Sequence, residues 1–291
     1  MSNNDLIIPE RSRDIGDFIV GRLLPFRKKR MVGPFIFIDH MGPTQMGNGK
    51  FMDVDQHPHI GLATLTYLLS GEIVHADSLG TNQLIRPGSV NWMVAGSGVS
   101  HTERTPNHLR EADSYVMHGY QIWVALPKEF EKADPSFHHF SAAELPHWQE
   151  GDLDFSLIAG EAFGKKSPVP VHSPLFMLEL KTNTANQIDL SGKLKGEIGI
   201  CVVKGAIHAC ENRVEAGNLL VSKEEDVCKL SLEADSHVIF FGGEALPEKR
   251  HIYWNFVASE AETIEEAKEK WEAWDWPKVP NDETYVPLPG K

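Results

Sequence analysis

Short runs of apolar residues, each followed by glycine or proline, form the main pattern in the first half of the chain. The clearest runs cover residues 34–39, 64–69, 83–86, 89–95 and 120–126. Apolar runs of this length between turn residues are typical of strands, and their close spacing favours a β-sandwich or β-barrel over alternating strands and helices. The first half is therefore predicted to be all-β.

The same pattern returns in the second half after a polar interval. From residue 128 to about 151 the chain is rich in histidine, glutamate and proline, which predicts a connector with little regular structure. Strand-like runs resume at residues 175–180, 198–203 and 237–241. The Lys-Gly-Ala turn at 204–206 follows its run as Ser-Gly-Glu at 70–72 does, which indicates a duplicated barrel. Because 291 residues suffice for two domains, we predict domains at 1–145 and 146–291.

One helix is predicted near the C-terminus. Capping-box patterns begin at Ser259 and Thr263, each with a glutamate three residues later. Apolar residues follow with helical spacing at positions 264, 267, 271 and 274. The helix is expected to begin near Glu260, to be ended by Pro277 and to lie across a barrel.

Composition and charge exclude several classes of protein. Hydrophobic residues make up 41% and charged residues 24%, as in ordinary soluble globular proteins. With 28 basic and 41 acidic residues the net charge is −13, which argues against nucleic acid as a direct partner. No apolar run approaches the roughly 20 residues of a membrane helix, and the N-terminus does not resemble a signal peptide.

Cysteine usage indicates a reducing compartment. The three cysteines, Cys201, Cys210 and Cys228, fit no disulfide framework and contain no Cys-x-x-Cys pair. We expect a cytoplasmic protein in which they are ordinary buried residues.

Two pairs of potential metal ligands have the spacing of residues on one face of a strand. Residues i and i+2 of a strand point to the same side, so His57 and His59 can direct both imidazoles at one point. The same rule places His101 and Glu103 on one face. If the two strands are neighbours, three imidazoles and one carboxylate meet. The predicted metal ligands are therefore His57, His59, His101 and Glu103.

The type of donor indicates which ions suit this site. Neutral imidazole and carboxylate suit Fe, Mn, Co, Ni, Cu or Zn, and four protein ligands leave positions open for catalysis. With fourteen histidines present, one His-x-His pair could arise by chance, but a second same-face pair is harder to explain in that way. Asp53 and Asp55 are assigned to a loop before His57 and are a second choice. The other histidines, including His75, are interpreted as surface or structural residues.

The spacing resembles the first cupin motif, in which His-x-His is followed by a glutamate and a glycine. Here Thr64 stands at the usual glutamate position, and Gly71 fills the glycine position. A Pro-Gly turn at 87–88 precedes His101, as in the second cupin motif, although the interval is longer. The sequence resembles a cupin that carries its carboxylate at Glu103.

That alteration resembles the pirin family. The matching segments are VGPF at 32–35, DHMGP at 39–43, HPH at 57–59, TLTYLLSG at 64–71, WMVAGSGVSHTE at 92–103 and QIWVALP at 121–127. Looser matches occur at 242–247 and 254–257. The resemblance implies an all-β bicupin, with two cupin-type β-barrels, a short C-terminal helix, and metal in the N-terminal barrel only.

The resemblance also implies an activity. Pirin-like proteins include quercetin 2,3-dioxygenases, so we expect one divalent transition metal, Fe(II) first and Ni, Co, Mn, Cu or Zn as alternatives. The expected partners are a flavonol-like small molecule and O₂, with Glu103 as general base for the flavonol 3-hydroxyl. A metal-containing regulatory protein that acts through a protein partner is the alternative. A sugar isomerase has less support, because no Lys and Arg cluster accompanies the ligands. We expect a monomer without a membrane association.

Overall fold

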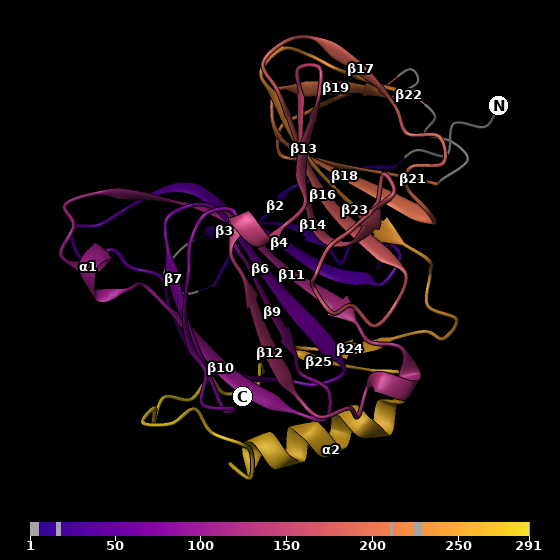
Figure 1. Cartoon of the computed structure of the whole chain (residues 1–291). Coiled ribbons are helices and arrows are strands. Elements are labelled where there is room, and N and C mark those ends of the chain that lie inside the picture. The colour runs from indigo at the N-terminus through magenta and orange to yellow at the C-terminus, as the bar shows by residue number, and fades with distance from the viewer. Residues whose placement is uncertain (1–5, 16–18, 210–211, 224–228, 291) are drawn as a thin grey trace. The chain divides into compact units, whose positions relative to one another are not determined.

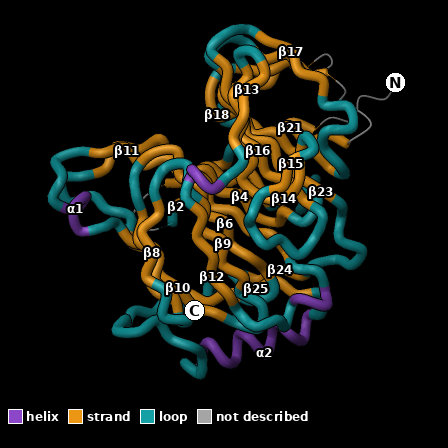
Figure 2. The backbone as a smooth tube through the Cα atoms, viewed as in Figure 1, coloured by secondary structure: helices purple, strands orange, loops and turns teal. Residues whose placement is uncertain are grey.

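The computed structural model of the chain describes residues 6–15, 19–209, 212–223 and 229–290. Strands make up most of the regular structure, and helices are few and short, as Figure 2 shows. The predicted all-β fold is confirmed. No helix among these residues is long and apolar enough to span a membrane.

Two sheets formed mainly by the first half of the chain contain the predicted strands. The larger, in the order β12-β9-β6-β11-β4-β3-β2, consists of β2 (Arg11–Asp14), β3 (Ile19–Leu24), β4 (Phe35–Met46), β6 (Leu62–Ser70), β9 (Val90–Val94), β11 (Tyr115–Ala125) and β12 (Ser136–Phe140). The smaller, in the order β5-β10-β7-β8, consists of β5 (Asp53–His59), β7 (Ile73–Asp77), β8 (Asn82–Ile85) and β10 (Val99–Arg104). We call these two sheets the first barrel.

Two further sheets form what we call the second barrel. The larger follows the order β1-β21-β18-β23-β16-β14-β13, and β15 pairs with β14. Its strands are β1 (Leu6–Pro9), β13 (His147–Glu150), β14 (Leu153–Ala162), β15 (Lys165–Lys166), β16 (Leu175–Thr182), β18 (Glu197–Lys204), β21 (Asn218–Lys223) and β23 (Ser236–Gly243). The smaller, in the order β17-β22-β19-β20, consists of β17 (Asn186–Asp189), β19 (Ala206–Ala209), β20 (Asn212–Glu215) and β22 (Lys229–Leu232).

The strand orders confirm the duplication. In the first barrel β9-β6-β11-β4 are neighbours, and in the second β21-β18-β23-β16 take the same places. The smaller sheets repeat in the same way, since β5-β10-β7-β8 corresponds to β17-β22-β19-β20. The turns after β6 and β18 use Gly71 (φ 80°) and Gly205 (φ 74°), a left-handed conformation that favours glycine.

Helices occupy few residues. The longest is α2 (Ala261–Glu272), which buries Ile264, Ala267 and Trp271 and contacts β24 (His251–Tyr253) and β25 (Phe256–Ala258) (Figure 1). The other helical segments in the described part of the chain are α1 (Asn107–Arg110) and two 3-10 turns, η1 (Lys128–Phe130) and η2 (Ala142–Glu144). The helix and its buried face are therefore as predicted.

Three details of the prediction are wrong. The interval from 128 to 151 contains β12, β13 and two 3-10 turns instead of an irregular connector. The capping boxes do not form, because no side chain caps α2 and the Ser259 hydroxyl donates to Glu131 at 2.8 Å. The helix also ends at Glu272, well before Pro277, and Trp274 then adopts φ 58°.

Two compact units alternate along the chain. The described residues of Met1–Ser12, Gly21–Ile38 and Ala143–Leu246 form one unit, and those of Arg13–Val20, Asp39–Ala142 and Pro247–Lys291 form the other. A contiguous division into cupin domains after residue 145 stays a prediction.

The interiors of the two barrels differ in chemistry. In the second barrel, Ile188, Leu230 and Leu232 of the smaller sheet pack with Leu178 and Phe240 of the larger sheet in one apolar cluster. The first barrel has an apolar cluster too, which includes Ile73 and Ile85 with Leu68 and Met117. However, its smaller sheet also carries buried histidines and carboxylates, and these form the candidate site.

A buried glutamate in the second barrel, paired with two basic side chains, gives stability that depends on pH. Burial alone would raise the pKa of Glu179, but His237 and Lys181, whose nitrogens lie 2.8 Å and 2.9 Å from its carboxylate, lower that pKa to about 2. A shift of this size corresponds to about 3 kcal/mol of folding free energy. Because the folded pKa is depressed, this contribution is present above the unfolded pKa near 4.5 and is lost as pH falls towards about 2.

We expect Glu179→Gln to lower the free energy of unfolding by up to about 3 kcal/mol at about pH 5, with the difference from wild type shrinking as the solution is acidified. Urea unfolding at several pH values measures this. Glu161→Gln, which alters an exposed glutamate paired with Lys166, is the matched control and should change little. A pH-independent loss in Glu179→Gln would contradict the assigned ionisation.

Candidate metal site

The candidate site lies on the smaller sheet of the first barrel, where β10 lies between β5 and β7. His101 of β10 lies opposite His57 of β5 on one side and opposite Asp77 of β7 on the other. After β5 the chain reverses at Gly61, which has φ 66°, and a Cβ there would overlap the carbonyl oxygen of Val257. Glycine at this position lets β5 end at His59 and β6 begin at once.

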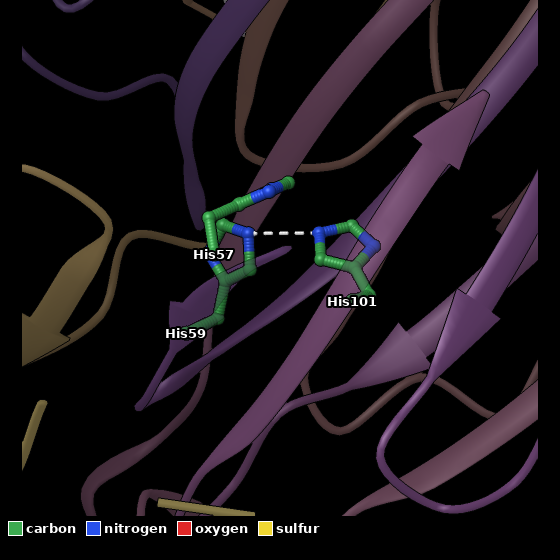
Figure 3. Close-up of side chains that lie close together, drawn as sticks. All are labelled: His57, His59 and His101. Atoms are coloured by element: carbon green, nitrogen blue, oxygen red, sulfur yellow. Dashed lines mark hydrogen bonds between the residues drawn. The ribbon is translucent and has the colours of Figure 1, made fainter. Parts of the chain in front are cut away.

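Three imidazoles converge from these two neighbouring strands. His57, His59 and His101 each offer one ring nitrogen, and the three nitrogens lie within 4.8 Å of one another. The Nε2 atoms of His59 and His101 are 3.1 Å apart, and Figure 3 shows these rings facing each other. All three side chains are buried. Histidine, cysteine, aspartate and glutamate are the usual metal ligands. Among the described residues, these three histidines are the group of such side chains that lie close enough together to hold a metal ion.

Contacts at the Nδ1 atoms of His57 and His101 direct their Nε2 atoms towards the cluster. The Nδ1 of His57 lies 2.8 Å from the backbone oxygen of Asp55, so Nδ1–H donates there and Nε2 keeps its lone pair. The Nδ1 of His101 lies 3.2 Å from the Nδ1 of His75. In both residues the nitrogen that faces the cluster is therefore Nε2.

Burial keeps the three imidazoles neutral. Desolvation lowers the pKa of His57 to about 4, although the hydrogen bond to Asp55 acts in the opposite direction. Burial and the neighbouring imidazoles hold the pKa values of His59 and His101 well below the usual range. A neutral imidazole has a free lone pair, which is the form that binds metals.

The separation of one pair of ring nitrogens fits a first-row metal ion. Imidazole nitrogens bind such ions at about 2.1 Å, so nitrogens on adjacent coordination positions lie about 3.0–3.4 Å apart. The 3.1 Å between the Nε2 atoms of His59 and His101 is within this range. His57, His59 and His101 would hold the ion.

The fourth predicted ligand, Glu103, is buried next to this cluster but is not one of the converging groups. Its carboxylate lies 3.4 Å from the hydroxyl of Thr66, which also lies 2.9 Å from Gln121. The register of β10 with β5 shifts between His101 and Glu103, with the extra residue on β5, so Glu103 lies opposite Val54. On its other side β10 keeps a regular register with β7, where Glu103 lies opposite His75. Burial raises the pKa of Glu103, although the electrostatic influence of His75 and the Thr66 hydrogen bond act in the opposite direction.

The two aspartates before His57 are not in a loop, which corrects the sequence-based expectation. Asp53 and Asp55 lie in β5, where Asp53 pairs with Arg110 and Asp55 lies 3.1 Å from Arg104. Neither belongs to the cluster of three histidines.

The histidine of β7 lies closer to the site than its sequence context predicts. His75, interpreted from the sequence as surface or structural, is buried and contacts both His101 and Asp77. The signal was available, because His75 and Asp77 have the same i, i+2 spacing as the two predicted pairs. Of the cysteines, Cys201 is buried as expected, and Cys210 and Cys228 lie outside the described residues.

The second barrel has no equivalent of this cluster among its described residues. Its counterparts of β5 and β10 are β17 and β22, which place Ile188 opposite Leu230. These apolar side chains belong to the second-barrel core. The ligand-type residues therefore occur on one copy of the duplicated sheet.

Fold and site together define a class. The chain contains two copies of one β-barrel, which is the architecture of a bicupin. One barrel has a buried cluster of three histidines, and the other is filled with apolar side chains. The sequence profile of the pirin family matches residues 18–124, and that of the pirin C-terminal cupin domain matches residues 177–276. A pirin-like protein of Caulobacter vibrioides is 47% identical over 98% of this chain and 99% of its own length. The chain belongs to the pirin family.

Solved structures agree with this assignment. The chain is similar to a quercetin 2,3-dioxygenase from Acinetobacter baumannii, with a TM-score of 0.89 and 34% identity over 99% of this chain and 95% of that one. A bacterial pirin from Escherichia coli, solved in complex with nickel(II), has a TM-score of 0.64 and 19% identity over 83% of this chain and 100% of that one. The second similarity establishes the fold alone.

Proposed function

We propose that the protein is a metal-dependent dioxygenase of the quercetin 2,3-dioxygenase type, which cleaves a flavonol-like substrate with O₂. The observation that carries the proposal is the buried cluster of three neutral imidazoles in one barrel. The similarity to a quercetin 2,3-dioxygenase over nearly the whole chain supports it.

We propose His57, His59 and His101 as ligands, with Glu103 as the fourth. When bound, a divalent metal with open positions would bring the oxygen of a flavonol and O₂ together. The imidazole and carboxylate donors suit Fe(II), our first candidate, as well as Ni, Co, Mn, Cu or Zn. The ligand residues would fix the position of the ion. The barrel wall excludes bulk water from them, since His59 and His101 are 1% and 0% exposed.

Glu103 is the proposed proton acceptor. Its burial raises its pKa, so its carboxylate takes up a proton more readily than an exposed glutamate. The Thr66 hydroxyl lies beside that carboxylate and restricts its position. Glu103 would accept the proton of the flavonol 3-hydroxyl at a carboxylate oxygen.

Buried aromatic and polar groups lie beside the cluster. His57 and Glu103 are each 8% exposed, whereas His101 is fully buried. The indole of Trp123, 7% exposed, packs edge-on against His59 with ring centroids 5.2 Å apart. A flat aromatic substrate is the kind of molecule that packs favourably against such a ring.

Oxygen uptake tests the proposal. We expect the protein, loaded in turn with Fe(II), Ni, Co, Mn, Cu or Zn, to consume O₂ with a flavonol and one of these metals. The matched flavone without the 3-hydroxyl should give no turnover, because it has no proton for Glu103 to accept. No oxygen uptake with any metal, together with tight binding of a protein partner, would contradict the dioxygenase and favour the regulatory alternative.

A further inference from the structure

A line of buried polar contacts leads from the candidate ligand His101 to β7. The inward positions of β7 are Ile73, His75 and Asp77, so two of three are polar where a barrel strand usually places apolar side chains. The Nδ1 of His75 lies 3.2 Å from the Nδ1 of His101, and its Nε2 lies 3.0 Å from a carboxylate oxygen of Asp77. Both ring nitrogens of His75 are used, so His75 is not an additional ligand.

The chemistry of the two rings permits one arrangement when Nε2 of His101 faces a metal. Its ring proton must then lie on Nδ1, and only a lone pair on Nδ1 of His75 can accept it. A neutral His75 with that lone pair carries its own proton on Nε2, where an acceptor is needed. Asp77 supplies that acceptor, so the carboxylate selects the tautomer of His75, which in turn selects that of His101.

The orientation of this acceptor is fixed by the turn after β7. One carboxylate oxygen of Asp77 accepts from the backbone N–H groups of Leu79 and Thr81 at 2.9 Å and 3.0 Å. The other oxygen is left for His75. Asp77 is fully buried, and the ring of His75 stacks on Phe137 with centroids 4.6 Å apart.

We propose that Asp77 and His75 are positioning residues that fix the tautomer and ring orientation of His101 and thereby set the affinity of the site for its metal. The inference rests on the proposed function, because it requires metal binding at His57, His59 and His101. Hydrogen-bond partners of metal-bound histidines typically contribute 10–100-fold to metal affinity.

A pair of substitutions at His75 separates hydrogen bonding from packing. His75→Phe keeps a ring against Phe137 but removes both nitrogens, and we expect it to weaken Co(II) binding about 10–100-fold. His75→Gln can accept from His101 through its oxygen and donate to Asp77 through its amide, and should retain most of the affinity. Chelator competition measures the affinity, and the Co(II) absorption spectrum reports the coordination.

Asp77→Asn gives an independent test with almost no change in size. The backbone donors of Leu79 and Thr81 hold the amide oxygen, so the amide NH₂ faces His75 and its Nε2 must accept. The proton of His75 then lies on Nδ1 and opposes the proton of His101, which drives His101 away from the metal-binding tautomer. We expect Co(II) affinity to fall as in His75→Phe, and the double variant to be no weaker than either single variant.

The outcomes distinguish this inference from the proposed function. Wild-type protein that binds no Co(II) would remove the metal site and the inference together. Wild-type binding with affinities within about threefold in His75→Phe and Asp77→Asn would overturn the positioning role alone. Equal losses in His75→Phe and His75→Gln, with normal circular dichroism of the metal-free proteins, would also overturn it, because packing rather than hydrogen bonding would be responsible.

Discussion

Replacing His101 or His57 by alanine is expected to remove most of the bound metal. Each change deletes one of three imidazoles that converge within 4.8 Å, and the remaining two cannot complete the site. The loss in affinity should exceed the roughly 100-fold upper limit for an outer hydrogen-bond partner, because a ligand itself is missing. Metal content per chain, measured by elemental analysis after equilibration with a limiting concentration of metal, tests this expectation.

His208→Ala is the matched control for the single-site arrangement. His208 lies on β19 of the second barrel, is exposed, and has its Nε2 atom 2.8 Å from Glu233. Its removal should leave metal content unchanged. Equal metal loss from His208→Ala and His101→Ala would contradict a single site in the first barrel.

The fold was predictable where strands bury continuous apolar runs. β6 and β9 were recognisable from their composition alone, because nearly all their side chains are buried. β12 was not, since its sequence Ser-Phe-His-His-Phe is half-buried throughout and the strand lies at the edge of its sheet. Its strand form depends on pairing with β9 from Val90 to Val94, which no local pattern records.

Capping depends on tertiary contacts in the same way. The Ser259 hydroxyl bonds to Glu131, more than a hundred residues earlier in the sequence, instead of capping α2. Local sequence patterns therefore predicted the position of the helix correctly. They predicted the wrong hydrogen-bond partner for the Ser259 side chain.

The part of the site that follows from the alternation of side chains along a strand could be predicted from the sequence. The alternation of side chains brought His57, His59 and His101 together once β5 and β10 paired. It could not show that Glu103 lies outside the group of converging nitrogens, because alternation gives the face of a side chain and not its distance from the others. It also could not show that β7 lies beside β10, which is what brings His75 to His101.

Glu103→Gln is expected to reduce flavonol turnover per bound metal by about 10²–10⁴-fold, the usual effect of losing a general base. The substitution keeps the shape of the side chain and its contact with Thr66 but removes the charge that accepts a proton. Metal affinity should fall only modestly, because the three imidazoles remain. Thr64, which stands at the usual cupin glutamate position, carries a hydroxyl that is a poor base at neutral pH.

The metal-free Glu103→Gln variant should be at least as stable as wild type at neutral pH. Burial raises the pKa of Glu103, so the folded protein holds this carboxylate at a cost that a neutral amide avoids. Lost turnover in a protein of undiminished stability would then report on proton transfer rather than on folding. Steady-state oxygen uptake, normalised to measured metal content, is the measurement, and Glu161→Gln is the control for an exposed glutamate. Turnover per metal near that of wild type would limit Glu103 to a structural ligand and move the proton acceptor elsewhere.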